Sequence, residues 1–300
     1  MSGSDRNLPQ NTGSDHRARR RGGDGVERVT LLGPGLLYAA ALVAVPLVLL
    51  VVYAFLTARR FGDVGRPFTT ENVQRLTEPV YRSVVFTSVR LALIATLIAL
   101  AIGYPAAYAI TRLRRWRTVA LIAVVLPFWT NFLIRTYAWI VLLNNEGLIN
   151  KLARSAGLID TPVALMNNEP AIVLGLVYAY LPLMILPLYA ALERLDPEIV
   201  EAAGNLGAGG FTRFRTVIFP LTAQGAITGS LFVFIPSLGN FVVPELLGGG
   251  KTSTLGTLAR DQFLKAQNWP FGSTIALVVL VLVVAIVIVQ NAVVKRWSAT

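Results

Sequence analysis

The amino-acid sequence predicts an all-α, polytopic membrane protein with about six transmembrane helices. Two properties of the composition indicate this class: 54% of the 300 residues are hydrophobic, and only 14% are charged. Soluble domains usually carry about 25% charged residues. The apolar residues also fall into long runs rather than being spread along the chain, which is typical of membrane-spanning helices.

Each of the long apolar runs can cross a bilayer as a helix. The first is too long for the apolar core of a cleaved signal peptide and lacks a convincing cleavage site, so we expect an uncleaved anchor. The preceding residues 1–30 predict a disordered basic tail in the cytoplasm. The runs lie near residues 31–56, 84–110, 117–142, 171–192, 216–247 and 273–294.

The distribution of arginine and lysine predicts that both chain ends lie in the cytoplasm, in a multi-pass protein of the inner or plasma membrane. Retention of basic residues on that side explains the net charge of +11, so we expect the lipid bilayer and no nucleic acid as a partner. The basic residues that this orientation places inside include Arg112, Arg114, Arg115, Arg117, Arg194, Arg213, Arg215, Lys295 and Arg296.

The sequence argues against an enzyme. It has no cysteine, and its one histidine, His16, lies in the polar tail, so a metal site is not expected. Gly248 to Thr252 resembles the end of a phosphate-binding loop, but Glu245 stands where that motif needs a glycine, and a hydrophobic helix precedes it. We therefore expect no cofactor, and any ATP must be bound by a partner.

A short acidic helix is predicted between the fourth and fifth runs, with Asp196 as its N-cap and Pro197 at its first position. Glycines, including Gly207, end this helix and allow a sharp turn. Such a helix, standing in the cytoplasm between two spans, is typical of a docking element for a soluble partner. One face carries Ile199, Val200, Ala203 and Leu206, and the other carries Glu198, Glu201 and Asn205.

Polar residues in the third run are candidates for a solute pathway. Pro127 predicts a kink, and Trp129 and Asn131 follow it at membrane depth. Asn131 has the alternative role of a hydrogen bond to a neighbouring helix. Arg135, which Tyr137 follows, is a candidate for the pathway or its gate, but it could also reach the headgroups or pair with a carboxylate. Arg90 has the same alternatives.

The fifth run is predicted to be broken in its outer half. Unwound backbone over Pro236 to Asn240 would survive only beside a cavity, which makes Asn240 and Glu245 candidate pathway residues. Glu245 could attract a cationic solute, or it could lie at the outer rim in ordinary water. The residues expected to interrupt this run are Gly225, Gly229, Pro236, Gly239 and Pro244.

The acidic helix and the residues after it resemble the EAA loop of ABC-importer permeases. That motif is Glu-Ala-Ala, three residues, Gly, nine residues, and then Ile-x-Leu-Pro. Val217 and Phe219 replace the Ile and Leu, and both changes are apolar. The matching residues are Glu201, Ala202, Ala203, Gly207 and Pro220.

More of the chain is similar to the polyamine (spermidine/putrescine) branch of these permeases, in its PotB/PotH-like subunit. Together with the EAA loop, this likeness runs through most of residues 84–290. The matching segments are Leu126 to Arg135, Gly175 to Pro182, Leu188 to Tyr189, Leu195 to Asp196, Ile235 to Gly249, and Asn268 to Gly272.

The resemblance implies a type I ABC-importer permease fold over residues 31–300, with a cytoplasmic coupling loop near 193–215. It further implies a second homologous permease subunit, two cytoplasmic ATPases that bind the ATP, and an extracytoplasmic solute-binding protein. The cargo it suggests is a polyamine, although an unpaired Arg135 would repel one. The alternatives are a permease for another small organic solute, a stand-alone secondary transporter or channel, and a membrane scaffold or receptor.

Overall fold

The structure is a computed structural model that describes residues 23–59 and 63–297. The chain divides into two units at Val52. The described part of the first unit belongs to helix α1 (Gly23–Ala54). This helix starts before the first span that the sequence predicts, which lies near residues 31–56. Of the expected disordered tail, residues 1–22 lie outside the described residues, and residues 23–30 are helical.

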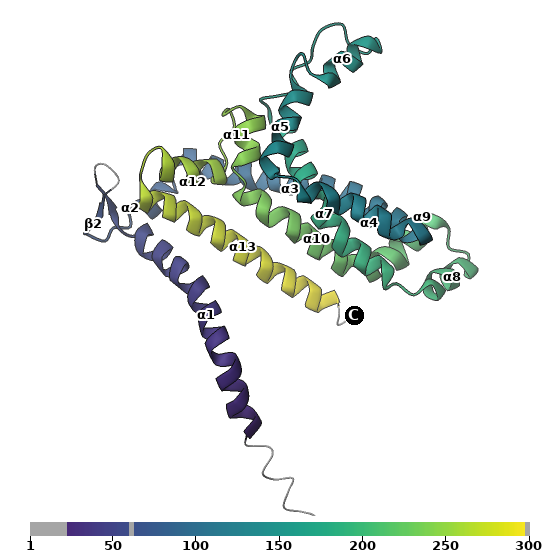
Figure 1. Ribbon diagram of the computed structural model, residues 1–300, viewed down its shortest axis with the longest axis horizontal. Coiled ribbons are helices and arrows are strands. Elements are labelled where there is room, and N and C mark those ends of the chain that lie inside the picture. Colours follow the sequence, from purple (N-terminus) through teal and green to yellow (C-terminus); the bar gives the residue numbers. More distant parts are fainter. Residues whose placement is uncertain (1–22, 60–62, 298–300) are drawn as a thin grey trace, which may run out of the picture. The chain divides into compact units, whose positions relative to one another are not determined.

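The second unit has a core of three long helices that pack side by side (Figure 1): α3 (Pro79–Arg112), α7 (Glu169–Glu193) and α10 (Phe219–Gly239). Their contacts bury the largest apolar cluster, which includes Leu91, Leu176 and Met184. Helix α13 (Trp269–Trp297) packs against α10 and the shorter α12 (Leu255–Leu264).

Shorter elements connect these helices at two ends of the bundle. One end, which we call the α11 end, carries the hairpin β1 (Thr57–Ala58) and β2 (Val64–Gly65) and helix α2 (Glu71–Arg75). It also carries α6 (Leu148–Ser155), α11 (Val242–Gly248) and α12. Helix α6 lies in the segment that follows the third span.

The other end, which we call the α8 end, contains α8 (Pro197–Asn205) and the short α9 (Gly210–Arg213). A π-helical segment, η4 (Phe214–Ile218), joins α9 to α10. The turn after α3 is the 3₁₀ segment η2 (Arg114–Trp116).

The third span is broken. It consists of α4 (Arg117–Val125), the 3₁₀ segment η3 (Leu126–Trp129) and α5 (Phe132–Leu143), with a bend of 93° between the two halves. Among the described residues, five helices are long and apolar enough to cross a membrane, or six when this bent pair counts as one span. The expectation of about six spans is confirmed.

The fifth run is broken in its outer half, as expected, between Gly239 and Val242, but Pro236 does not unwind it. Pro236 lies inside α10, the helix continues to Gly239, and a separate helix, α11, starts at Val242. Pro236 removes only the backbone hydrogen bond to the Phe232 carbonyl, four residues earlier, and the helix continues on both sides of it.

Gly225 and Gly229 do not interrupt α10 either; they let it approach α7 closely. A Cβ atom on Gly225 would lie 2.5 Å from the Ala191 Cβ and 2.8 Å from the Pro187 carbonyl oxygen. A Cβ on Gly229 would lie 2.8 Å from the Met184 sulfur. Small residues have this role where membrane helices pack backbone to backbone.

We predict that Gly225→Ala destabilises the second unit, because the added methyl meets the backbone of α7 and overpacking costs about 1–3 kcal/mol. Gly239→Ala is the matched control, since a Cβ there meets nothing within 4 Å. Thermal unfolding of the purified chain in detergent should give a lower midpoint for Gly225→Ala only. Equal midpoints for the two variants would contradict the close-packing role.

Candidate functional site

At the α8 end, the local sequence forms the helix that the caps predict. The Asp196 carboxylate accepts a 2.9 Å hydrogen bond from the Glu198 backbone N–H, and Pro197 opens the helix. The helix ends at Asn205, and Gly207 has a φ of +87°, which favours glycine. The predicted N-cap, helix and terminating glycine are therefore all present.

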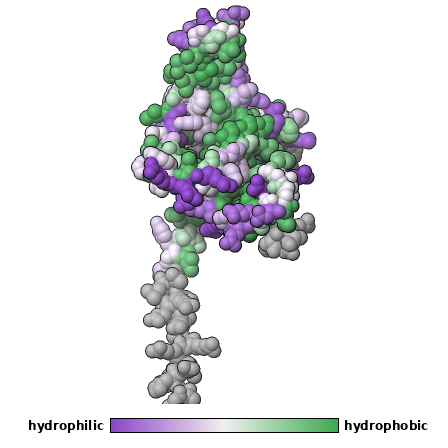
Figure 2. All heavy atoms as spheres, turned by 90° about the vertical axis from the view of Figure 1, so that its right-hand side faces the viewer, coloured by the Kyte–Doolittle hydropathy of each residue, from purple (hydrophilic) through white to green (hydrophobic). Residues whose placement is uncertain are grey.

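Helix α8 presents apolar and acidic side chains to the exterior of the chain. Ile199 of α8 is exposed, Leu206 directly after α8 is 89% exposed, and the adjacent Phe211 of α9 is 78% exposed. Glu201 and Ala202 are exposed, whereas Ala203 is half-buried. Figure 2, which looks onto this end, shows hydrophilic side chains gathered on it together with hydrophobic patches. The apolar face of α8 is thus only partly covered by its own chain.

The α8 end is connected to the core by short, direct contacts. Helix α8 packs against α9 and η4, and the Arg213 guanidinium lies 3.3 Å from where a Cβ on Gly204 would stand. Pro220 lies in the first turn of α10, directly after η4. Helix α8 thus contacts η4, the segment that leads directly into α10.

At the α11 end, the break in the third span presents polar groups and an aromatic ring. Asn131 caps α5, its side-chain oxygen accepting a 2.8 Å hydrogen bond from the Leu133 N–H. It is exposed and forms no bond to a neighbouring helix among the described residues, so that alternative is not found. Trp129 is 84% exposed at the break, and Tyr137, one and a half turns into α5, is also exposed.

Arg135 lies against aromatic rings. Its guanidinium carbon is 5.1 Å from the Phe128 ring centroid and 5.8 Å from that of Phe132. The Nε atom is buried without a hydrogen-bond acceptor, and Arg135 forms no salt bridge within residues 23–59 and 63–297. The alternative of a carboxylate partner on another span is therefore not found among the described residues of this chain, and the guanidinium forms cation–π contacts instead.

Asn240 stands at the second break, between α10 and α11, and is buried. Its side-chain oxygen accepts a 2.9 Å hydrogen bond from the Val243 N–H, and its amide nitrogen donates to the Tyr180 hydroxyl at 2.7 Å. The side chain thus caps α11 and ties it to α7. Because α11 packs against α5, the structure brings this break close to the elements that carry Asn131, Arg135 and Tyr137.

Glu245 belongs to an ion network rather than standing free. Arg260 of α12 lies 3.1 Å from Glu245 and 2.6 Å from Asp261, and Lys265 lies 3.2 Å from Asp261. Burial alone would raise the pKa of Asp261, but hydrogen bonds from Arg260 and Lys265 outweigh it and lower that pKa. The hydrogen bond to Asp261 in turn raises the pKa of Arg260. The sequence suggested that Glu245 either attracts a cationic solute or lies at the outer rim in water. Neither suggestion includes the salt bridge with Arg260.

Sequence reasoning missed the partners of several candidate residues. Arg90 forms a salt bridge with Glu169 of 2.6 Å, so its charge is balanced at the start of α7. Tyr180 and Arg260 also went unassigned, because the residues that they contact lie 60 and 15 positions away and no local pattern links them.

Comparison with known proteins identifies the family to which this chain belongs. A family model described as "Binding-protein-dependent transport system inner membrane component" matches residues 99–299. The spermidine/putrescine transport system permease protein PotB of Haemophilus influenzae is 42% identical over 248 residues, which cover 82% of this chain and 87% of that protein. PotB of Escherichia coli is 39% identical over 246 residues, which cover 82% of this chain and 88% of that protein.

Solved structures agree on the fold. A chain in the crystal structure of a bacterial ABC transporter involved in the import of the acidic polysaccharide alginate aligns with a TM-score of 0.74. The alignment covers 94% of this chain and 99% of that chain, at 15% identity, and it therefore shows the fold alone. The predicted type I permease fold is confirmed, and the relatives are named as transport permeases rather than enzymes.

We predict that Asn240→Ala loosens α11, because it removes both the helix cap and the bond to Tyr180. Loss of an N-cap costs about 0.5–2 kcal/mol. Amide hydrogen exchange over Val242–Gly248 should become several-fold faster than in the parent chain. Asn291→Ala, at an exposed position of α13, is the control. Unchanged exchange in Asn240→Ala would show that the cap does not hold the break.

Proposed function

This chain belongs to the family of binding-protein-dependent transport system inner membrane components, and from that premise we propose how it works and what it carries. It is the permease subunit of an ATP-driven importer, and its proposed cargo is a polyamine such as spermidine or putrescine. The observation that carries the coupling part of the proposal is the exposed, partly apolar face of α8 beside its acidic residues.

The α8 face suits a groove on a separate ATPase subunit. Leu206 and Phe211 provide apolar area that the chain itself leaves uncovered, and Glu201 provides a charge for a basic residue of the partner. Ala202 and Ala203 are small enough to let the ATPase backbone approach. Closure of two ATPases would then rock the bundle between inward-open and outward-open states, with ATP bound by the ATPases alone.

The same reasoning proposes the rest of the assembly. A second homologous permease subunit completes the pathway, and an extracytoplasmic solute-binding protein delivers the cargo at the α11 end. The chain ends and the α8 end lie in the cytoplasm, as the crowding of arginine at this end supports: Arg112, Arg114, Arg115, Arg117, Arg194, Arg213 and Arg215.

The two helix breaks are the proposed pathway. Trp129 offers an exposed aromatic face to an alkylammonium group, and Asn131 and Tyr137 offer hydrogen-bond acceptors nearby. Asn240 and Glu245 belong to the second break, where α11 packs against α5. Relatives at 42% and 39% identity are named spermidine/putrescine permeases, which supports the same chemical class of cargo here.

The charge of Arg135 bears on this cargo. An unscreened guanidinium in the pathway would repel a polyamine. The rings of Phe128 and Phe132 lie against this guanidinium and the Nε atom is buried, so these aromatic groups cover part of the charge. A polyamine can therefore pass the aromatic side of this residue with less repulsion than an exposed arginine would cause.

We predict that Ala203→Asp abolishes coupled transport without preventing membrane insertion, because a carboxylate adds volume and charge to the partly exposed face of α8 that is proposed to dock. Uptake of radiolabelled spermidine into cells that depend on this transporter should fall at least about tenfold, with normal abundance of the chain in the membrane. Ala58→Asp, at an exposed position of β1, is the control and should transport normally.

Two results would overturn different parts of the proposal. Normal uptake by Ala203→Asp at normal abundance would contradict docking through α8. If the parent transporter takes up no spermidine or putrescine but hydrolyses ATP with its partners, the cargo is wrong while the coupling role stands.

The orientation predicts a labelling pattern that the absence of native cysteine makes simple to measure. In intact cells, a membrane-impermeant maleimide should label Arg154→Cys, at the end of α6, and should not label Glu201→Cys. Permeabilised cells should label both. Labelling of Glu201→Cys from outside intact cells would reverse the topology and remove the basis for ATPase docking.

A further inference from the structure

A basic pocket lies at the α8 end, apart from the proposed pathway. Its volume is about 490 Å³, and it opens between the end of α3, the start of α4, the end of α7, and α8 with α9. Four arginines and two glutamates line it, which leaves a surplus of positive charge: Arg112, Arg114, Arg117, Arg213, Glu193 and Glu201.

The arginines of this pocket are incompletely paired within the chain. Arg117 forms a 2.7 Å salt bridge with Glu193. Arg112 donates a 2.6 Å hydrogen bond to the Tyr108 hydroxyl, which is neutral. Among the described residues, Arg114 and Arg213 form no salt bridge, and the Nε atom of Arg213 is buried without an acceptor. The pocket therefore has donors that an anion would satisfy.

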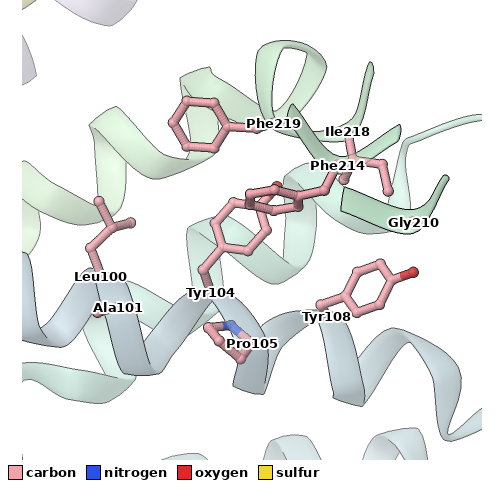
Figure 3. Close-up of a pocket in the computed structure, with 9 residues that line it drawn as sticks. All are labelled: Leu100, Ala101, Tyr104, Pro105, Tyr108, Gly210, Phe214, Ile218 and Phe219. Atoms are coloured by element: carbon pink, nitrogen blue, oxygen red, sulfur yellow. The ribbon is translucent and has the colours of Figure 1, made fainter. Parts of the chain in front are cut away.

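A second cavity, of about 480 Å³, adjoins the basic pocket and is strongly apolar. Tyr108 and Ile218 line both cavities, so the two lie next to each other at these side chains. Figure 3 shows the aromatic rings of Tyr104, Phe214 and Phe219 gathered around the apolar cavity, with Leu100 at its far side and Tyr108 at the side of the basic pocket.

The lengths of the two cavities match one leaflet of a bilayer. Along α3, twelve residues separate Leu100 from Arg112, which corresponds to about 18 Å of helix. Half of a hydrocarbon core is about 15 Å thick. Trp116, which is exposed beside the pocket in η2, is the residue type that gathers at the headgroup level.

From this adjacency of a basic and an apolar cavity we propose that the two together bind one anionic phospholipid. Its phosphate would accept hydrogen bonds from the arginines of the basic pocket, and an acyl chain would fill the apolar cavity between α3 and α10. An acidic side chain of a soluble partner would suit the basic pocket, but it has no hydrocarbon chain to fill the apolar cavity. This proposal concerns a structural lipid and does not depend on the identity of the cargo.

Because the lipid would contact α3, α9 and η4 at once, it would hold the α8 end against the core. Arginine suits this role since its planar guanidinium binds phosphate oxygens in pairs and stays charged. Basic pockets between transmembrane helices are known to bind anionic headgroups.

The test is native mass spectrometry of the full chain, with whichever subunits co-purify, exchanged into detergent that contains phosphatidylglycerol or phosphatidylcholine. The parent chain should retain phosphatidylglycerol in preference to phosphatidylcholine. Arg114→Gln/Arg213→Gln should reduce that retention at least about tenfold, because two charge-assisted hydrogen bonds are lost. Ala101→Trp, which fills the apolar cavity without a change of charge, should also reduce it.

Lys151→Gln/Arg154→Gln removes the same charge from α6 and should retain the lipid as the parent does. Equal loss in this control, or equal retention of both lipids by the parent, would overturn the proposal. A third result would assign the pocket to free phosphate instead of a lipid: phosphatidylglycerol is lost in the arginine variant but not in Ala101→Trp, and millimolar inorganic phosphate displaces it from the parent chain. Loss of a co-purified ATPase with unchanged lipid would assign the arginines to a protein partner.

Discussion

The backbone hydrogen bonds at the two helix breaks constrain the rest of this structure. Away from water, each free N–H or C=O costs several kcal/mol, so a span can break only where other groups satisfy the exposed backbone. Here two asparagines do so, Asn131 at the start of α5 and Asn240 at the start of α11. Because Asn240 also binds Tyr180, the second break is fixed to the core helix α7.

The packing of the core complements these breaks. Glycines of α10 lie against the α7 backbone, so these two helices pack closely along their length, whereas α5 and α11 are short. The chain thus combines a rigid set of long helices with two capped, bent segments. The α8 end joins the rigid set through η4 and Pro220, and the capped segments lie at the opposite end.

Much of this architecture follows from local sequence patterns, and the rest depends on distant contacts. The α8 helix was predictable because its cap, first-turn proline and terminal glycine are all within a dozen residues. The break at Thr130 was anticipated through Pro127, but its angle of 93° depends on the elements packed around it. Pro236 and Gly225 were misread, since the same residue types that break a helix also permit close packing, and only the neighbouring helix distinguishes the two.

The candidate site shows the same division. The residues Trp129, Asn131, Arg135, Asn240 and Glu245 were identified from their depth and chemistry. The ring contacts of Arg135 and the Glu245–Arg260 pair emerge only when α11, α12 and η3 are assembled. Sequence therefore predicted which polar groups lie at membrane depth, and the fold shows which of their charges have a partner within the described residues.

The π-helical segment η4 has a geometric consequence for the junction between α9 and α10. A π turn contains one residue more than an α turn, and an extra residue rotates the following side chains by about 100° around the axis. Phe211, before this segment, is consequently exposed, while Ile218, at its end, is buried in the core although the helix is continuous. One inserted residue thus lets a continuous helix expose apolar side chains at its start, in α9, and bury them along α10.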